Sequence, residues 1–434
     1  MFAYYLDLAL RSLRRNKVLT TLMVLALALG IGATITTLTV LRLLSGDPLP
    51  QKSAQLFYPQ LDPNTKDGYI AGQAKPAPTM TYVDAMNLLH AHRATRQVAM
   101  ALSQAKVLPQ QGGDHPFFSD AVMTTTDFFA MFDAPFQYGN GWAAADDDSG
   151  AQLVVIAGFL NDKLFGGANS VGKTIRLNDR DFRIVGVLKP WAPQPRFYAQ
   201  DLGGRSYGDG DAVFLPLRTA RAVDMGPQDT ECYAAVTDIK HLETAPCMWL
   251  GVWVELVDDA AVAGYKSFLS SYAQQQIAQG RFQRPETALL DLMGWLRDQQ
   301  VVPDDVRLQA GLAFGFLLIC VVNTVGLLLA KCLRRSQEIG VRRALGATRR
   351  EIFTQFMVEA AIVGMAGGVL GLLFAELGLL GIRHQPAEYA SLAHLDLGMF
   401  FFTFVVALGA SLIAGILPAW RACVLAPAPQ LKAA

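Results

Sequence analysis

Four long apolar runs stand out along the chain. Each is longer than the roughly 20 residues that an α-helix needs to cross the ~30 Å hydrocarbon core of a bilayer. Three of them contain no charged side chain and are bounded on both sides by charged residues, whereas the fourth is interrupted by two glutamates. The runs cover residues 18–41, 308–330, 352–382 and 397–420. This pattern predicts four transmembrane helices.

The first run could instead be the apolar core of a secretory signal peptide. Residues 18–41 are, however, too many for such a core, which spans roughly 7–15 residues, and residues 41–50 contain no small-residue cleavage site. We therefore expect residues 18–41 to be the first transmembrane helix.

Basic residues are distributed unequally among the short segments outside these runs. Thirteen Lys and Arg residues fall in 1–17, 331–351 and 421–434, whereas the short segment 383–396 holds only Arg383. Because short cytoplasmic segments are enriched in Lys and Arg, we predict that both termini and the loop 331–351 lie in the cytoplasm. Residues 1–17 are expected to form an amphipathic helix, and 383–396 a short extracytoplasmic loop.

The long segment 42–307 has the composition of a water-exposed domain, with 23 basic and 30 acidic residues. Partly alternating, β-branched stretches predict strands, longer periodic stretches predict helices, and Pro and Gly clusters predict loops. The predicted strands are 152–156, 173–177 and 182–188, the helices are 79–92 and 260–279, and the loops are 59–78, 190–195 and 203–210. The fold class that follows is an α-helical membrane protein, with four transmembrane helices and a large α+β extracytoplasmic domain between helices 1 and 2.

The overall composition agrees with this class. Only 17% of the residues are charged, against roughly 25% in a typical soluble domain, which argues against an ordinary soluble enzyme and against a disordered chain. The 37 Lys and Arg residues balance 37 Asp and Glu residues, so the net charge gives no support for binding nucleic acid. The lipid bilayer is the partner that the composition implies.

Two of the five cysteines, Cys232 and Cys247, fall in the predicted extracytoplasmic domain. An oxidising compartment would permit a disulfide between them, but two separate buried thiols explain the same sequence, and both possibilities stay open.

A match to the nucleotide-binding P-loop pattern occurs at residues 167–174. That pattern binds phosphate only between a buried strand and a helix, whereas here a helix-like stretch, 161–165, precedes it and a strand-like stretch follows. We reject nucleotide binding there. His90, His92 and the aspartates 146–148 likewise lack the spacing of a metal site and are expected on the solvated surface.

Three segments carry a family resemblance. Residues 334–347, RRSQEIGVRRALGA, closely resemble the RRxEIGxxRALGA signature of FtsX/MacB-type ABC transporter permeases. Residues 418–427 resemble the C-terminal PAxRA…LDP motif of that family, with Ala426 in place of the acid. Residues 164–187 are similar to the MacB-like periplasmic core domain.

The resemblance implies a permease in the bacterial cytoplasmic (inner) membrane that forms a homodimer or a heterodimer with a related permease. It also implies a cytoplasmic ABC ATPase subunit that binds ATP and Mg, so that no cofactor is expected in this chain and the chain itself is not an enzyme. Because only about 17 residues precede the first apolar run, we expect that ATPase to be a separate polypeptide. A periplasmic adaptor and an outer-membrane channel are further candidate partners.

The basic loop 331–351 is the candidate contact with the ATPase. Its candidate residues, inside the resemblance, are Glu338, Ile339, Gly340, Arg342, Arg343, Ala344, Leu345 and Gly346. We expect Ile339, Ala344 and Leu345 to form an apolar face, the arginines to pair with acids of the partner, and the glycines to divide the loop into brief helices. Thr348 and Glu351 form a capping-box pattern that predicts the start of the third helix. The alternative role of the loop is to bind anionic lipid head groups.

Two acids, Glu359 and Glu376, lie within the third run. Acids at membrane depth are costly and often functional, but both lie near an end of the run and could reach the interface instead. Small residues spaced four apart at 311/315, 364/368 and 367/371 favour close helix packing, either within one subunit or between two.

None of the four runs has a continuous polar stripe, which argues against a wide aqueous path and favours a mechanical role. We expect ATPase motion to be transmitted to the outer domain, most simply for the export of amphiphilic compounds or peptides. The alternatives are extraction of lipoproteins, as by LolCE-type permeases, and FtsX-like signalling to a periplasmic hydrolase.

Overall fold

The computed structural model describes residues 2–67, 69–70, 75–109, 115–236 and 241–424, without the side chains of residues 2–4, 6, 10 and 14. The predicted motif position Ala426 lies outside the described residues. The chain divides into two units, one formed by Met1–Ser45 with Val302–Ala434 and the other by Gly46–Val301.

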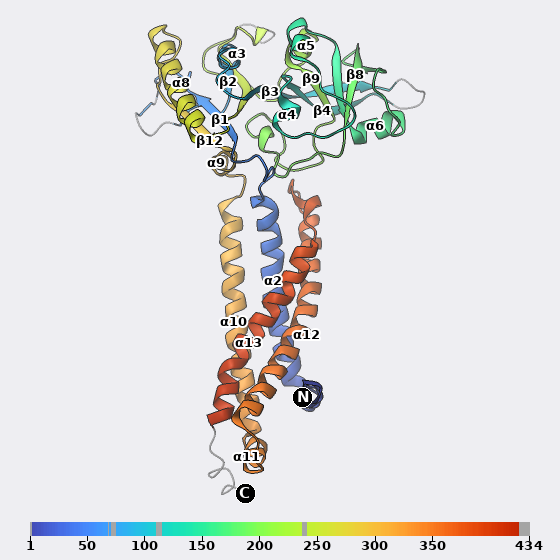
Figure 1. Ribbon diagram of the computed structural model, residues 1–434, viewed down its shortest axis with the longest axis vertical. Coiled ribbons are helices and arrows are strands. Elements are labelled where there is room, and N and C mark those ends of the chain that lie inside the picture. Colours follow the sequence, from blue (N-terminus) through green and yellow to red (C-terminus); the bar gives the residue numbers. More distant parts are fainter. Residues whose placement is uncertain (1, 68, 71–74, 110–114, 237–240, 425–434) are drawn as a thin grey trace. The chain divides into compact units, whose positions relative to one another are not determined.

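The first unit is a bundle of helices (Figure 1). Its elements are α1 (Phe2–Arg15), α2 (Lys17–Ser45), α10 (Asp304–Arg334), α11 (Ser336–Ala344), α12 (Arg349–Arg383), the 3-10 helix Ala390–Leu392 and α13 (Leu397–Val424). Among the described residues, four helices, α2, α10, α12 and α13, are long and apolar enough to cross a membrane. The four helices correspond to the four apolar runs, and each extends beyond its run.

Glycines on α12 allow this helix to approach two neighbours closely. A Cβ atom built on Gly364 would lie 2.8 Å from the carbonyl oxygen of Ala407 on α13. On another face, a Cβ on Gly371 would lie 2.9 Å from Cγ2 of Ile31 on α2. The pairs 364/368 and 367/371 therefore serve packing within one subunit. Gly311 on α10 has no such neighbour within 4 Å.

The ends of the short helix α11 differ in part from the sequence prediction. Gly340 lies inside α11 rather than breaking it, so that expectation was wrong, whereas Gly346 follows the helix with a positive φ of 101°. The predicted capping box is present, since the Thr348 side chain accepts from the Glu351 N–H and the Glu351 carboxylate accepts from the Thr348 N–H. It places the start of α12 at Arg349.

The second unit is an α+β domain built on one mixed sheet (Figure 1). Its strands are β1 (Leu56–Leu61), β2 (Met80–Thr81), β3 (Arg96–Leu108), β4 (Phe117–Thr124), β5 (Phe136–Gly139), β6 (Leu153–Ala157), β7 (Thr174–Leu177), β8 (Arg180–Leu188), β9 (Val213–Pro216), β10 (Glu231–Cys232), β11 (Cys247–Glu255) and β12 (Thr287–Asp291). Its helices are α3 (Tyr82–His90), α4 (Phe128–Met131), α5 (Ala144–Ser149), α6 (Gly158–Phe165), the 3-10 helix Phe197–Ala199, α7 (Leu217–Ala222), α8 (Asp259–Ala278) and α9 (Leu292–Asp298).

The main sheet runs in the order β12-β1-β11-β3-β4-β9-β6-β8-β5. The pairs β4–β9 and β6–β8 are parallel, and the other pairs along this path are antiparallel. The strand β11 is buried at every position, because it lies inside the sheet between β1 and β3 and is covered by helices. Apolar side chains of these strands form the core, together with residues of α3, α7 and α8.

The predicted strands and helices of this domain are present with shifted ends. The predicted loop 59–78 was wrong at its start, because residues 59–61 belong to β1 and pair with β12. The P-loop-like segment follows the helix α6 and leads into the strand β7, which is the reverse of the order that phosphate binding needs.

The structure joins Cys232 and Cys247 by a disulfide. The two residues face each other as partners on the antiparallel strands β10 and β11. The other cysteines, Cys320, Cys332 and Cys423, are free and buried in the bundle.

Candidate functional site

The inner face of α11 packs against the ends of three long helices. Ile339 is buried there, in a cluster formed by Cys332, Ile352, Phe356, Ala419, Ala422 and Cys423. These residues come from α10, α12 and α13. The expectation that Ile339 belongs to an exposed face is therefore wrong, because this side chain anchors α11 to its own subunit.

The outer face of α11 carries the exposed stripe, which we define as Gln337, Val341, Ala344 and Leu345. Their spacing of four, three and one residues places them on one side of a helix. Leu345 is 82% exposed and Val341 is 47% exposed. Apolar side chains therefore face outward from a short helix whose opposite side is buried.

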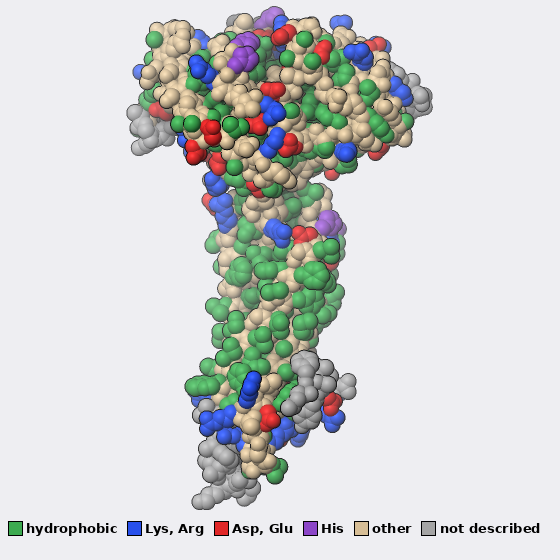
Figure 2. All heavy atoms as spheres, viewed as in Figure 1, with side chains coloured by type: hydrophobic (Ala, Val, Ile, Leu, Met, Phe, Trp, Pro, Cys, Tyr) green, Lys and Arg blue, Asp and Glu red, His purple; other side chains and the backbone are tan. Residues whose placement is uncertain are grey.

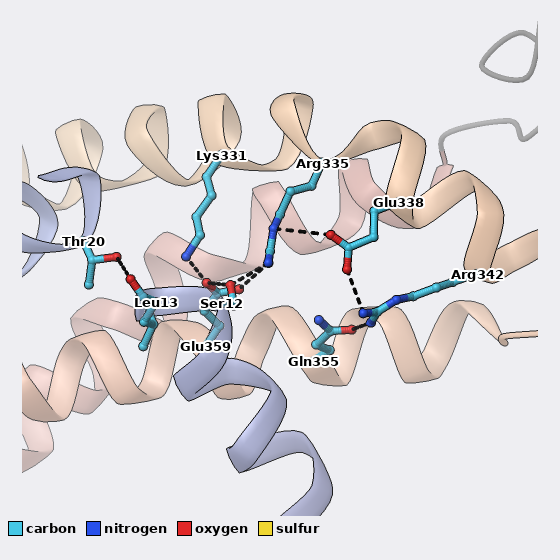
Figure 3. A network of polar contacts seen from close by, with 9 residues as sticks. All are labelled: Ser12, Leu13, Thr20, Lys331, Arg335, Glu338, Arg342, Gln355 and Glu359. Carbon is cyan, nitrogen blue, oxygen red and sulfur yellow. Dashed lines mark hydrogen bonds and ion pairs between the residues drawn. The ribbon is translucent and has the colours of Figure 1, made fainter. Parts of the chain in front are cut away.

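A chain of polar contacts, the coupling network, connects α11 with the neighbouring helices (Figure 3). Its members are Ser12, Lys331, Arg335, Glu338, Arg342, Gln355 and Glu359. They come from α1, α10, α11, α12 and the residue between α10 and α11. Only three members of this network, Glu338, Arg342 and Glu359, were predicted from the sequence as candidate site residues.

The centre of the network is an ion pair between Lys331 on α10 and Glu359 on α12, whose side chains are each only 1% exposed. The Ser12 hydroxyl donates a hydrogen bond of 2.6 Å to Oε1 of Glu359. Arg335 in turn donates to the Ser12 hydroxyl oxygen at 2.5 Å. A buried charge is tolerated only when it is paired and hydrogen-bonded. Oε1 of Glu359 meets that condition through α1 and α10, whereas Oε2 is buried without a hydrogen-bond partner among the described residues and lies 3.9 Å from Nη1 of Arg335.

The network continues along α11. Nε of Arg335 lies 3.8 Å from Oε2 of Glu338, and Arg342 donates to Oε1 of Glu338 at 2.7 Å. Arg342 also donates to Oε1 of Gln355 on α12 at 3.1 Å. Positive and negative groups thus alternate from Lys331 to Arg342. Arg342, one of the two arginines expected to pair with acids of a partner protein, is therefore already paired within the subunit.

Arg343 fixes α11 to a further helix. Its Nη1 donates to the carbonyl oxygen of Cys423 at 3.1 Å, at the carboxyl end of α13, where the helix dipole favours a positive charge. Together with Ile339 and the coupling network, this contact ties α11 to every long helix that reaches this end of the bundle except α2. A force on the exposed stripe would therefore act on several helices at once.

The second intramembrane acid has different surroundings. Glu376 lies near the other end of α12, is 49% exposed, and accepts from Arg383 at 2.6 Å. Of the two acids predicted from the sequence, only Glu359 is buried. The partners Lys331 and Arg335 resembled ordinary flanking charges in the sequence, and no spacing signal connects them to a residue on another helix.

Lys and Arg side chains gather at the end of the bundle that carries α11 (Figure 2). They include Arg334, Arg335, Arg342, Arg343, Arg349 and Arg350. Such a basic end suits a membrane surface with anionic lipids as well as an acidic protein partner.

Two family models match the chain over its two parts. The model described as MacB-like periplasmic core domain matches residues 20–263, and the model described as FtsX-like permease C-terminal matches residues 310–427. The chain belongs to the FtsX/MacB-type family of ABC transporter permeases. The short helix α11 lies inside the second match, in the segment that the signature of residues 334–347 had indicated, and all members of its network except Ser12 also lie inside that match.

Relatives of the permease are distant in sequence. An uncharacterized ABC transporter permease, YvrN of Bacillus subtilis, is 24% identical over 70% of this chain and 68% of its own length. The macrolide export ATP-binding/permease protein MacB of Nitrobacter winogradskyi is 26% identical over 72% of this chain. The chain spans only 43% of the length of that relative.

One solved structure, the periplasmic region of MacB from Actinobacillus actinomycetemcomitans, is 14% identical with a TM-score of 0.36, over 56% of this chain and 92% of that one. A TM-score this low carries no argument, so the assignment to the family rests on the two matching family models.

Proposed function

We propose that this permease is the membrane subunit of an ABC exporter in the bacterial cytoplasmic membrane. Both termini and α11 lie in the cytoplasm, and the α+β domain lies outside. The clustering of basic residues at the α11 end supports this orientation. A separate cytoplasmic ATPase subunit binds ATP and Mg and docks on α11. Support for export comes from the MacB relative, a macrolide export protein that combines ATP-binding and permease parts.

The observation that carries the proposal is the exposed stripe of α11. In water, an outward-facing patch of Val341, Ala344 and Leu345 is most simply explained by a protein partner that covers it. The buried opposite face means that docking need not reorganise the helix. Charged residues next to the stripe would orient the bound ATPase more than they would increase its affinity.

In this mechanism the ATPase moves α11 as it closes on ATP. The coupling network and the cluster around Ile339 pass the motion to α1, α10, α12 and α13. Of these helices, α10 follows the outer domain directly in the chain, so motion of α10 reaches that domain through this connection. The outer domain then acts on amphiphilic compounds or peptides that are already outside the cytoplasm. A second permease subunit, an adaptor and an outer-membrane channel remain expected partners.

The docking step is tested with Leu345→Asp, which places a charge at the C-terminal end of the stripe, on a side chain that is 82% exposed. We expect the ATPase that co-purifies with the wild-type chain to be lost. Leu333→Asp is the matched control, because this leucine is also exposed (65%) but lies on α10, outside the stripe. Retention of the ATPase by Leu345→Asp, or equal loss in both variants, would contradict docking on α11.

A substitution at Ile339 is unsuitable for this test. Because its side chain is buried among α10, α12 and α13, an aspartate there would disturb the subunit itself. Loss of the ATPase from such a variant would not distinguish a docking surface from a damaged fold.

A further inference from the structure

The helix α10 lies at one side of the helical bundle (Figure 1) and packs chiefly against α2 and α13. Among the four spans that the structure describes, α10 has the smallest share of buried residues. Its buried side chains recur every three or four residues, as expected for one face of a helix. They include Val306, Ala310, Ala313, Leu317, Cys320, Thr324, Leu328 and Lys331. The other side of α10 is therefore open to lipid or to a second protein.

The outward side of α10 contains a set of exposed residues that alternate at spacings of three and four. Residues at these spacings form a seam along which two helices can pack over their whole length. We call this set the α10 seam. It consists of Gln309, Leu312, Phe316, Ile319, Asn323, Gly326, Ala330 and Leu333.

Asn323 is the exceptional residue of the α10 seam. It lies four residues from the centre of the apolar run 308–330, or about 6 Å along the helix axis, and hence within the ~30 Å hydrocarbon core. Its side chain is exposed and forms no hydrogen bond with a described residue. By contrast, Thr324 on the buried side donates to the carbonyl oxygen of Cys320 at 2.8 Å. An amide without a partner in hydrocarbon is costly, so Asn323 indicates a protein neighbour at this depth.

The same residue of a second copy is a matching partner for Asn323. An asparagine amide has both donors and an acceptor, so two of them can pair across a twofold axis. Such an axis along the membrane normal brings equal residues of two copies to the same depth. The other spans offer no such amide, because α2 and α13 contain no Asn or Gln and Gln355 of α12 already accepts from Arg342.

Small residues beside Asn323 allow two helices to approach closely. Gly326 and Ala330 follow Asn323 in the α10 seam, and a Cβ atom built on Gly326 would meet no atom within 4 Å. Gly326 thus has no packing role within the subunit, unlike Gly364 and Gly371 on α12. Small residues in membrane helices let two backbones come together, which brings polar side chains within hydrogen-bond distance.

We propose that the α10 seam is the interface between two copies of this chain, and that Asn323 is hydrogen-bonded there to the partner's Asn323. The two α10 helices run parallel, and Leu312, Phe316 and Ile319 pack against the second copy. This inference goes beyond the proposed function, which leaves the second permease subunit and its place of contact open. It does not depend on docking of an ATPase on α11.

The first test is disulfide cross-linking of the full chain, without the ATPase, in lipid vesicles at a low protein-to-lipid ratio. Ile319→Cys places a thiol in the α10 seam. Leu318→Cys is the matched control, because the two side chains are similarly exposed, 63% for Leu318 and 66% for Ile319, and point about 100° apart around the helix. Oxidation should join most Ile319→Cys chains into dimers, and no more Leu318→Cys chains than wild-type chains, whose free cysteines are buried. Absence of the Ile319→Cys dimer, or equal dimers in both variants, would overturn the proposal.

The second test measures the contribution of Asn323. Energy transfer between chains labelled at the C-terminus, followed as lipid is added, gives the dissociation constant of the dimer. Asn323→Leu should weaken the dimer by roughly tenfold, whereas Asn323→Gln, which keeps an amide, should stay within about threefold of the wild type. Because Asn323 is exposed in the single subunit, circular dichroism should show both variants folded. An unchanged dissociation constant in Asn323→Leu would overturn the proposed pairing.

A third comparison tests the close approach of the two helices. Gly326→Leu fills the α10 seam, and Gly311→Leu is its control, since Gly311 is another exposed glycine of α10 with no neighbour within 4 Å but lies outside the seam. We expect no measurable dimer in the first variant and a normal dimer in the second. Equal dimerisation of the two variants, or dimers that form only with a different permease, would overturn the assignment. Neither result would bear on docking of the ATPase, which Leu345→Asp tests separately.

Discussion

Replacing Glu359 with Gln should destabilise the helical bundle far more than the same change at Glu376. Both glutamates lie on α12 and both pair with a basic side chain. They differ in burial, since the Glu359 and Lys331 side chains are each 1% exposed, whereas Glu376 is 49% exposed. The comparison therefore holds the chemistry and the helix constant and changes only the surroundings.

The expected magnitude follows from what Glu359→Gln leaves behind. Lys331 stays buried without a counter-charge, and Ser12 and Arg335 lose a charged neighbour. Breaking a buried pair by removing one partner costs about 3–5 kcal/mol. An exposed pair such as Glu376 with Arg383 is worth about 0–1 kcal/mol. The double variant Lys331→Met, Glu359→Gln should recover most of the loss, because it removes the stranded charge.

The assay is unfolding of the purified full chain in mixed micelles by titration with a denaturing detergent, followed by circular dichroism. A loss in Glu359→Gln within about 1 kcal/mol of that in Glu376→Gln would refute the argument, because it would mean that Glu359 is hydrated or unpaired in the folded protein. The same conclusion would follow if the double variant were no more stable than the single one.

Further predictions concern the packing, the disulfide and the titration of the outer domain. Gly364→Ala should lower the free energy of unfolding by about 1–3 kcal/mol, because its new methyl group meets α13, whereas Gly311→Ala, with no neighbour within 4 Å, should not. Non-reducing mass spectrometry should find Cys232 and Cys247 linked, and their replacement by serine should cost about 3 kcal/mol in the chain-entropy model; free thiols in the native protein would contradict this. Because burial raises the pKa of Asp147 to about 6, this carboxyl stays protonated in the folded domain at pH values at which it is ionised in the unfolded chain. Relative to Asp147→Asn, the wild-type domain should therefore melt at a lower temperature at pH 7.5 than at pH 4.5, and an unchanged difference would contradict the shift.

The transmembrane helices were predictable because a bilayer leaves a chain few options. Backbone groups inside the hydrocarbon must be satisfied within the helix, so a long apolar run is nearly sufficient to identify a span. The ends of the helices were harder to predict, because hydropathy marks the residues that lie within the hydrocarbon, and a helix can continue beyond them. The helix α10 begins at Asp304 rather than at residue 308, where two aspartates in its first turn suit the helix dipole.

The details of the coupling site depend on tertiary contacts that no local pattern encodes. Gly340 was expected to break the loop, yet a glycine in a helix costs only about 1 kcal/mol, and the packing around Ile339 outweighs it. Which side of α11 is buried depends on its rotation against α12 and α13. A nine-residue helix with apolar residues on two sides does not specify that rotation by itself. The pairing of Lys331 with Glu359 likewise joins helices that are separate in sequence.

In the proposed mechanism, the coupling network lets a short helix at the end of the bundle act on helices that lie inside lipid. Apolar contacts alone hold those helices together weakly, because lipid tails solvate apolar side chains as well as protein does. The apolar cluster around Ile339 positions α11 but contains no directional contact that would resist a sideways slide. Glu359 changes this, because Lys331 and Ser12 pair with its Oε1 and Arg335 lies 3.9 Å from its Oε2 in one arrangement of three helices. A displacement of α11 that broke this arrangement would leave a buried charge unpaired, so the less costly response is for the joined helices to move together.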